Sequence, residues 1–248
     1  MGNQQWTSAF LSYTPTASPV AAANFPIENI ASLAGRPQLR VFRSTVVTQQ
    51  DIIVDFGSSK SVVATALLNA NFASVQLAHS PDNVTYTDYT GSPFTIAINK
   101  PRGGRYHLFV AFSFTKRYVR IRIPAQTPVD SAAYFSLGLA LFSGTLNTLL
   151  ANPQAPTVES LTRVYLRSGE DITPAGSFMS TQEWQTLLRP GEETQLFDIA
   201  LLGEHTPFLL FNNQGKSEEV SLWRYTGGLE ARSYSGHMEI NPRFREMV

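Results

Sequence analysis

Between Gln38 and Gly144 the chain is a series of short apolar or alternating runs, each bounded by Gly, Pro, Asn, Asp or Ser. Alternation with a period of two indicates β-strands, and no stretch here repeats with the longer period of an amphipathic helix. About eight strands in this length predict a β-sandwich or jelly roll. The runs cover residues 39–47, 51–56, 61–70, 74–80, 94–98, 105–114, 117–123 and 135–144.

The run 117–123 is rich in arginine, so it has to be judged as a nucleic-acid contact or as an ordinary strand. In a strand Tyr118, Arg120 and Arg122 share one face. The other face carries Arg117 followed by the apolar side chains of 119, 121 and 123. The pattern favours a half-buried strand whose arginines pair with carboxylates of a neighbouring strand. No glycine-aromatic RNA signature accompanies it, which counts against nucleic acid.

The pattern changes after Gly144. Residues 147–161 contain Pro153 and Pro156 and are predicted to be a linker. Residues 190–203 carry helix signals, with Pro and two acids at the front and Gly at the end. Strand candidates surround them, so the C-terminal part is predicted to be α+β. The expected organisation is an N-terminal arm (1–24), a jelly-roll domain (25–146), a linker (147–160) and a smaller α+β assembly domain (161–248).

Composition narrows the classes of partner. Lys plus Arg and Asp plus Glu number 19 each, so no net charge draws the chain to nucleic acid or an acidic membrane. No cysteine is present, which excludes disulfides and thiolate metal sites. The first residues lack the basic and apolar regions of a signal peptide, and no apolar run is long enough to span a membrane. We expect a soluble protein made in a cytoplasm.

Several motifs in order resemble the galactose-binding-like jelly roll of the discoidin type. The segments that carry this resemblance are Phe25–Ile30, Arg40–Ser44, Asp51–Gly57, Ala78–Tyr86 and Lys116–Ile121. Phe56 stands where that family has leucine, and the cysteine pair of many extracellular members is missing. The resemblance covers about half of the chain. It implies a jelly roll with recognition loops.

The second half is similar to the ring-forming part of tail-tip or distal-tail proteins of tailed bacteriophages. This resemblance depends on the order of elements more than on any one motif. Its elements are Trp184, the helix expected over 192–202, Thr206–Phe211, Leu222–Tyr225 and His237–Ile240. It implies a structural protein of a virion.

The residues of catalysis are sparse. The histidines lie far apart and never in a metal-binding spacing, at His79, His107, His205 and His237. Asp51 and Asp55 share a strand face and resemble a glycosidase acid pair, but a loop-capping role for Asp55 is favoured. A structural calcium ion stays open, although no dense Asp/Asn loop marks it. We expect no enzyme, no catalytic residue, no cofactor and no metal site.

Our leading expectation is a non-enzymatic structural protein in the tail tip or baseplate of a phage virion. It would be made in the bacterial host cytoplasm. It would form a ring of three or six copies of itself and bind other phage tail proteins. Arginine suits intersubunit contacts. The candidates for them are Arg43, Arg117, Arg120 and Arg122.

The alternative is a carbohydrate-binding module that recognises a cell-surface glycan, which could also be the adhesive part of a virion. Exposed aromatic rings beside Asp, Asn and Arg in one loop cluster favour this reading. The candidate glycan-binding residues are Asp82, Asn83, Tyr86 and Arg102. Tyr13, Phe25, Phe42 and Tyr89 are further aromatics that could stack on a sugar or serve only the core. Neither nucleic acid nor membrane insertion is expected.

Overall fold

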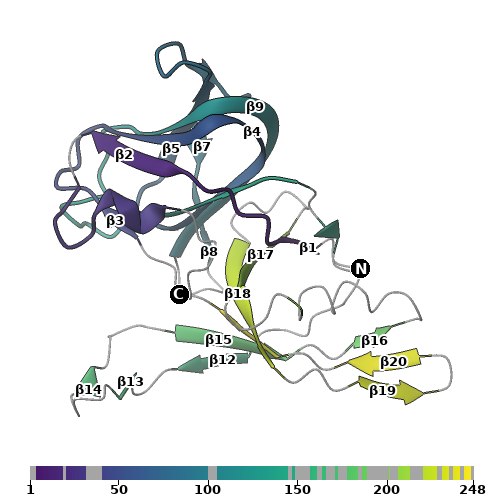
Figure 1. Cartoon of the computed structure of the whole chain (residues 1–248). Coiled ribbons are helices and arrows are strands. Elements are labelled where there is room, and N and C mark those ends of the chain that lie inside the picture. The colour runs from purple at the N-terminus through teal and green to yellow at the C-terminus, as the bar shows by residue number, and fades with distance from the viewer. Residues whose placement is uncertain are drawn as a thin grey trace.

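The structure is a computed structural model, and it describes residues 4–18, 21–31, 41–99 and 105–144 together with the strands and short pieces after them. The first part holds β1 (Gln4–Thr7), β2 (Thr14–Ser18), the 3₁₀ helix η1 (Ile27–Ile30), β3 (Phe42–Arg43), β4 (Gln50–Ala70), β5 (Ser74–Ser80), β6 (Thr87–Asp88), β7 (Phe94–Thr95), β8 (Ala97–Asn99), β9 (Arg105–Ile123) and β10 (Ser136–Phe142). The chain is mainly β, as predicted (Figure 1).

The jelly roll is one 9-stranded antiparallel sheet folded into two layers. Its main path is β3-β10-β4-β9-β5-β6, and β2, β7 and β8 pair with β4, β5 and β9 at the side. In one layer the first part of β4 pairs with β2 and with the end of β9, which pairs in turn with β5. In the other layer the end of β4 pairs with β10 and with the start of β9.

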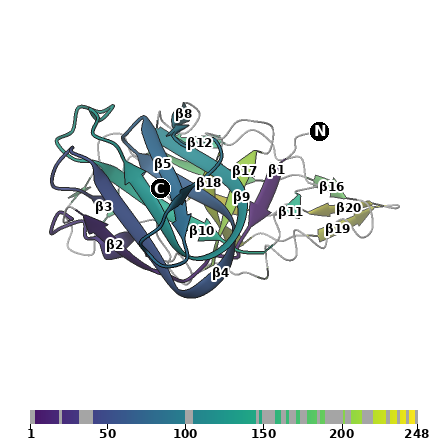
Figure 2. The ribbon, with the colours of Figure 1, turned by 90° about the horizontal axis from the view of Figure 1, so that it is seen from above.

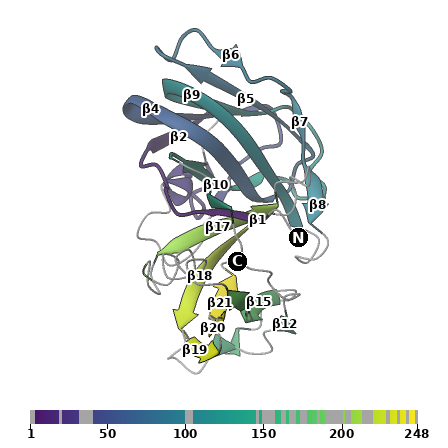
Figure 3. The same cartoon turned by 90° about the vertical axis from the view of Figure 1, so that its right-hand side faces the viewer.

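The two longest strands run through both layers side by side (Figure 3). We predicted separate strands over 51–56 and 61–70, and over 105–114 and 117–123, but each pair is one continuous strand. The polar residues 57–61 therefore form a bend and not a loop. Register shifts after Asp55, Val62 and Leu67 and the positive φ of 73° at Gly57 turn the pair from one layer to the other, because bulges increase bend and twist. Figure 2 shows the curve from above.

The core between the layers is apolar and closely packed. Ile52, Val54, Val119 and Ile121 contribute from one layer and Leu67 from the other, and all have at most 1% of their surface exposed. Phe72 and Phe135 meet edge to face, with ring centroids 5.8 Å apart. Phe42, one of the aromatics considered for stacking, is fully buried in this core. The predicted core face of 117–123 is confirmed for Val119, Ile121 and Ile123, whereas the Arg117 side chain is partly exposed and pairs with Asp55.

The N-terminal segment, expected to be an arm, contributes two strands to the molecule. β2 pairs with β4 at the side of the jelly roll, and Leu11 is buried in the core. β1 pairs with β17 (Pro207–Asn212) and with β11 (Asn147–Thr148). The strand Gln4–Thr7 thus joins the C-terminal part and has partners within its own chain.

The C-terminal part is described mainly through its strands. These are β11, β12 (Thr157–Ser160), β13 (Val164–Tyr165), β14 (Asp171–Ile172), β15 (Phe178–Glu183), β16 (Thr186–Leu188), β17, β18 (Val220–Gly227), β19 (Ala231–Tyr234), β20 (His237–Ile240) and β21 (Arg243–Glu246). A 7-stranded sheet has the order β11-β1-β17-β18-β21-β15-β12. β11 and β12 lie within the predicted linker. Of the predicted helix at 190–203, only the helical Leu201 lies among the described residues.

A second apolar cluster joins β17 and β18 to the outer face of the jelly roll. The small residues Ala64 and Ala66 of β4 and Ala140 of β10 let the hairpin approach closely. Phe211 of β17 stacks on Phe109 of β9 with ring centroids 3.9 Å apart. The remaining members are Phe10, Val63, Leu68, Phe142, Leu209, Val220 and Leu222. We call this set the junction core. No helix in the described part of the chain is long and apolar enough to cross a membrane.

Candidate functional site

Several of the predicted site residues gather at one end of a jelly-roll layer, where β4, β9 and β5 run side by side. Asp55 of β4 and Ser80 of β5 both lie opposite Tyr118 of β9. Beyond this row β5 passes into the loop 81–86, β4 enters its bend, and β9 carries Lys116 and Arg117. We call this the hairpin end. It brings residues from three strands that are distant in sequence onto one surface.

Asp82 fixes the loop that follows β5. Its Oδ1 accepts hydrogen bonds from the Ser80 hydroxyl at 2.8 Å and from the backbone N–H groups of Val84 and Thr85 at 2.9 Å each. These bonds, led by the one from Thr85, lower the pKa of Asp82 to about 2. Asp82 therefore lies among the candidate glycan-binding residues, and its Oδ1 fixes the conformation of the loop.

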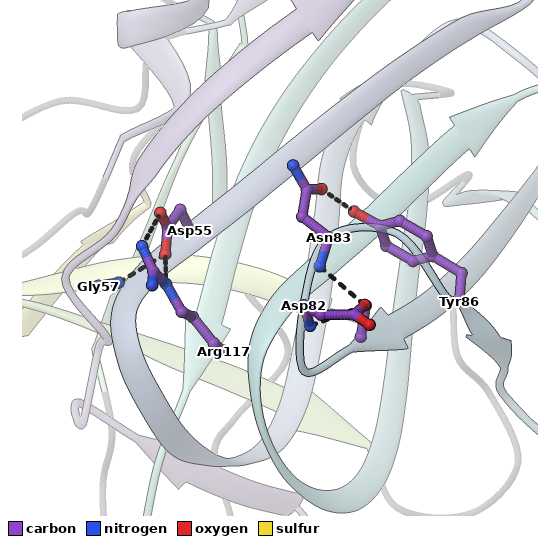
Figure 4. Close-up of polar contacts among 7 residues, drawn as sticks. Asp55, Gly57, Asp82, Asn83, Tyr86 and Arg117 are labelled. Carbon is purple, nitrogen blue, oxygen red and sulfur yellow. Dashed lines mark hydrogen bonds and ion pairs between the residues drawn. The ribbon is translucent and has the colours of Figure 1, made fainter.

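Tyr86 is brought against Arg120 by this loop. Asn83 has a positive φ of 64°, and its Oδ1 accepts a hydrogen bond from the Tyr86 hydroxyl (Figure 4). The Arg120 guanidinium carbon lies 4.3 Å from the centroid of the Tyr86 ring, within cation–π range. Burial is the main reason that the pKa of Tyr86 is raised. A predicted glycan residue and a predicted intersubunit residue thus form one pair.

Arg120 has few other partners. Its Nη2 lies 3.9 Å from Asp88 Oδ1, which is a long ion pair, and its side chain is 18% exposed. Its buried Nε makes no hydrogen bond to any described residue. A guanidinium offers five N–H donors, so those of Arg120 that reach the surface can bind another molecule.

Two Asp–Arg pairs flank Arg120 along the strands. Arg122 donates from Nε and Nη2 to the two carboxylate oxygens of Asp51, at 2.7 and 2.8 Å. Arg117 donates in the same way to Asp55, at 2.8 and 2.9 Å. Such two-point pairs fix both side chains. The cross-strand carboxylates predicted for this strand are confirmed, and these two arginines have their partners within the chain.

Asp55 has the chemistry of a loop cap and not of a general acid. Its Oδ1 also accepts from the backbone N–H of Gly57 at 2.7 Å (Figure 4). The bond from Arg117 is the largest cause of its lowered pKa, while a general acid needs a raised one. The capping role is confirmed. No group of three or more His, Cys, Asp or Glu within the described ranges could hold a metal ion.

Arg43 lies apart from the other three arginines. It belongs to β3, which pairs with β10 in the opposite layer, and its guanidinium carbon lies 3.8 Å from the Phe25 ring centroid and 4.7 Å from that of Tyr134. The geometry gives Arg43 a role in packing these rings. Tyr13 likewise has an internal partner, since its hydroxyl donates to the backbone oxygen of Ile30 at 2.6 Å. Arg102 lies outside the described residues.

Tyr89, one of the aromatics considered for stacking on a sugar, belongs to an aromatic cluster at the hairpin end whose other members were not predicted as a site. His79 stacks on Phe114 with ring centroids 5.1 Å apart, and Tyr89 stacks on Phe112 at 4.4 Å. Burial raises the pKa of Tyr89 and lowers that of His79, to which the charge of Lys116 adds. The alternation of 112 and 114 with polar neighbours was the available sequence signal. It indicates a shared face but not its partners.

No protein family and no curated protein matches this sequence. Among solved structures, a chitosan-binding module from a Paenibacillus chitosanase/glucanase is 24% identical, with a TM-score of 0.41 over 54% of this chain and 96% of that one. A family 32 carbohydrate-binding module of Clostridium perfringens, solved with galactose, is 15% identical, with a TM-score of 0.41 over 53% of this chain and 93% of that one. At this level of similarity, function has to be argued from the chain's own residues.

Proposed function

We propose that this chain is a carbohydrate-recognition protein that binds glycan without turnover. The binding face is the outer surface of the layer formed by β2, β4, β9 and β5, centred on Tyr86 and Arg120. The observation that carries this proposal is the Tyr86–Arg120 pair, flanked on the same layer by the Asp51–Arg122 and Asp55–Arg117 pairs.

The face suits sugars because their hydroxyl groups both donate and accept hydrogen bonds. Each bidentate pair uses two of the five N–H donors of its arginine and leaves lone pairs on its aspartate. Since the pairs already fix these side chains, little conformational entropy is lost on binding. The Tyr86 ring adds an apolar surface of the kind on which a sugar ring packs.

Tyr86→Ala should weaken glycan binding by about tenfold, because it removes the ring and frees Arg120 from its fixed place. Tyr86→Phe keeps the ring and should bind within about threefold of the natural protein. The measurement is binding to a panel of immobilised neutral and acidic glycans, followed by titration calorimetry on the best ligand.

Val84→Ala is the matched control, since Val84 lies in the same loop with 82% of its surface exposed and carries no part of the proposed face. It should bind as the natural protein does. A panel on which the natural protein binds nothing, or a Tyr86→Ala variant with unchanged affinity, contradicts the proposal.

A second candidate function is structural assembly in the tail of a phage virion, with other tail proteins as neighbours. The observation in its favour is the 7-stranded sheet, in which the outermost strands β11 and β12 have a described neighbour on one side only. Open strand edges allow pairing with another chain. The two functions are compatible, because a tail protein can also bind a host glycan.

Assembly predicts that the purified protein forms a closed ring of three or six copies. Light scattering coupled to size exclusion, at several concentrations, measures the mass in solution. A mass of three or six chains that holds on dilution supports the ring. A single-chain mass at every concentration contradicts self-assembly and leaves glycan recognition untouched.

A further inference from the structure

Two lysines lie directly opposite each other at the bend between the jelly-roll layers. Lys60 of β4 and Lys116 of β9 are register partners, and the next pairs along are Ser61 with Thr115 and Val62 with Phe114. Directly opposite residues share one face, with Cβ atoms about 4.5–5.5 Å apart. Two like charges in this position repel each other, and an anion that lies between them relieves this repulsion.

No carboxylate within the described part of the chain neutralises these lysines. Asp55 is held by Arg117, and Asp82 is held by its own loop. Neither lysine forms an ion pair with a described residue. Lys60 is exposed and Lys116 is half-buried, so both ammonium groups are available to a ligand.

The lysines stand over the aromatic cluster of the hairpin end. Lys60 and Lys116 have the strand phase of Val62 and Phe114, whose side chains belong to the core. Phe114 in turn stacks on His79 and packs against Tyr89 at a centroid distance of 5.2 Å. Lys116 lies two residues from Phe114 on β9, and its charge adds to the burial that lowers the pKa of His79. The two lysines therefore form a positively charged edge beside the aromatic cluster.

The aromatic cluster also contains polar atoms that have no hydrogen-bond partner among the described residues. The Tyr89 hydroxyl and His79 Nδ1 are buried, and neither makes a hydrogen bond to a described residue. Tyr89, Phe112 and His79 are themselves half-buried, so the cluster reaches the surface. Buried polar atoms are usually satisfied, so a ligand hydroxyl group that enters the cluster would supply the missing partners.

We propose that the Lys60–Lys116 pair and the ring cluster beneath it bind the acidic group of a carboxylated or sulfated sugar. This inference rests on the proposed glycan recognition and names its ligand class as acidic polysaccharide. A small anionic group fits between two ammonium ions, which act as point charges.

The test compares dextran, dextran sulfate and polygalacturonate by calorimetry at low salt. The natural protein should bind one acidic polymer about tenfold more tightly than dextran, and salt should weaken that binding. A carboxylate ligand is indicated by preference for polygalacturonate, and a sulfate ligand by preference for dextran sulfate. The double variant Lys60→Gln, Lys116→Gln should lose the advantage and still fold, because it removes repulsion.

Arg224→Gln removes one positive charge from β18, in the 7-stranded sheet and away from the bend of β4 and β9, and should keep the advantage. The imidazole titration of His79, followed by NMR, gives a second readout. Its pKa should rise in the double variant, and also when an acidic polymer binds, because each change offsets the charge of Lys116.

Three results would overturn the inference. One is an acidic advantage that survives in the double variant. Another is neutral glycan binding with no acidic advantage, which leaves the proposed function standing. The third is a DNA duplex bound as tightly through the same lysines, which would indicate a general polyanion site. Binding of no polymer at all, together with an empty glycan panel, would overturn both proposals.

Discussion

Phe211→Ala should lower the free energy of unfolding by about 3–5 kcal/mol, as expected for removing a buried phenylalanine. Phe211 is 2% exposed and stacks on Phe109, with ring planes 16° apart. Its loss opens a cavity in the junction core. Chemical denaturation followed by tryptophan fluorescence measures the effect, and Trp223 is a buried reporter on the adjacent strand.

The Phe109–Phe211 stack has its own test in a double-mutant cycle. Phe109→Ala should cost less, because Phe109 is only half-buried, and the coupling between the two should be about 0.5–1.5 kcal/mol. A transition that splits in two would indicate that the jelly roll unfolds separately once the junction is weakened. A loss below about 1 kcal/mol in Phe211→Ala would contradict the packing described here.

Asn71→Ala should be nearly as damaging, at about 2–4 kcal/mol, although it removes only a small polar group. Asn71 is 5% exposed. Its amide donates to Asp130 Oδ1 at 3.1 Å and to the Tyr134 carbonyl at 2.9 Å, and its Oδ1 accepts from the Ser136 N–H at 2.8 Å. The substitution leaves the partly buried Tyr134 carbonyl and Ser136 N–H without these partners. Thermal and urea unfolding both measure the loss.

Asp130→Ala supplies the comparison for Asn71. Asp130 is exposed and shares only one of the contacts of Asn71, so its substitution should cost no more than about 1 kcal/mol. Asn71→Asp keeps the acceptor for Ser136 but loses both donors, and should fall near the alanine variant. Equal effects at positions 71 and 130 would show that the buried amide is not what holds the 124–136 loop.

Much of the jelly roll could be predicted from residue alternation. The run 117–123 has apolar side chains at every second position, and Val119, Ile121 and Ile123 are at most 1% exposed. The opposite side chains had to pair with something polar, and Asp51 satisfies Arg122 as expected. The bend at 57–61 escaped prediction, because a polar stretch that separates two apolar runs has the same pattern whether it is a loop or a turn within a strand.

The candidate site could be predicted only in part. Asp82, Asn83 and Tyr86 are close in sequence, and their local hydrogen bonds follow from turn chemistry. The contact of Tyr86 with Arg120 depends on the register between β5 and β9, which no local pattern fixes. The presence of an arginine likewise does not show whether its partner lies in the same chain or in another molecule. That is why Arg117 and Arg122 were candidates for contacts between subunits.

The junction core also determines when the jelly roll can finish folding while the chain is synthesised on the ribosome. Ala64, Ala66 and Phe142 are synthesised well before the residues of β18 that pack over them. Leu222 of β18 follows Phe142 by roughly 80 residues. At about 5–20 residues per second, the apolar face stays bare for about 4–16 s of synthesis. Strand β1 waits longer for β17, because about 200 residues separate the two, which is about 10–40 s of synthesis. A nascent jelly roll therefore exposes an apolar surface that chaperones can bind. A chain truncated before β17 would keep that surface exposed permanently.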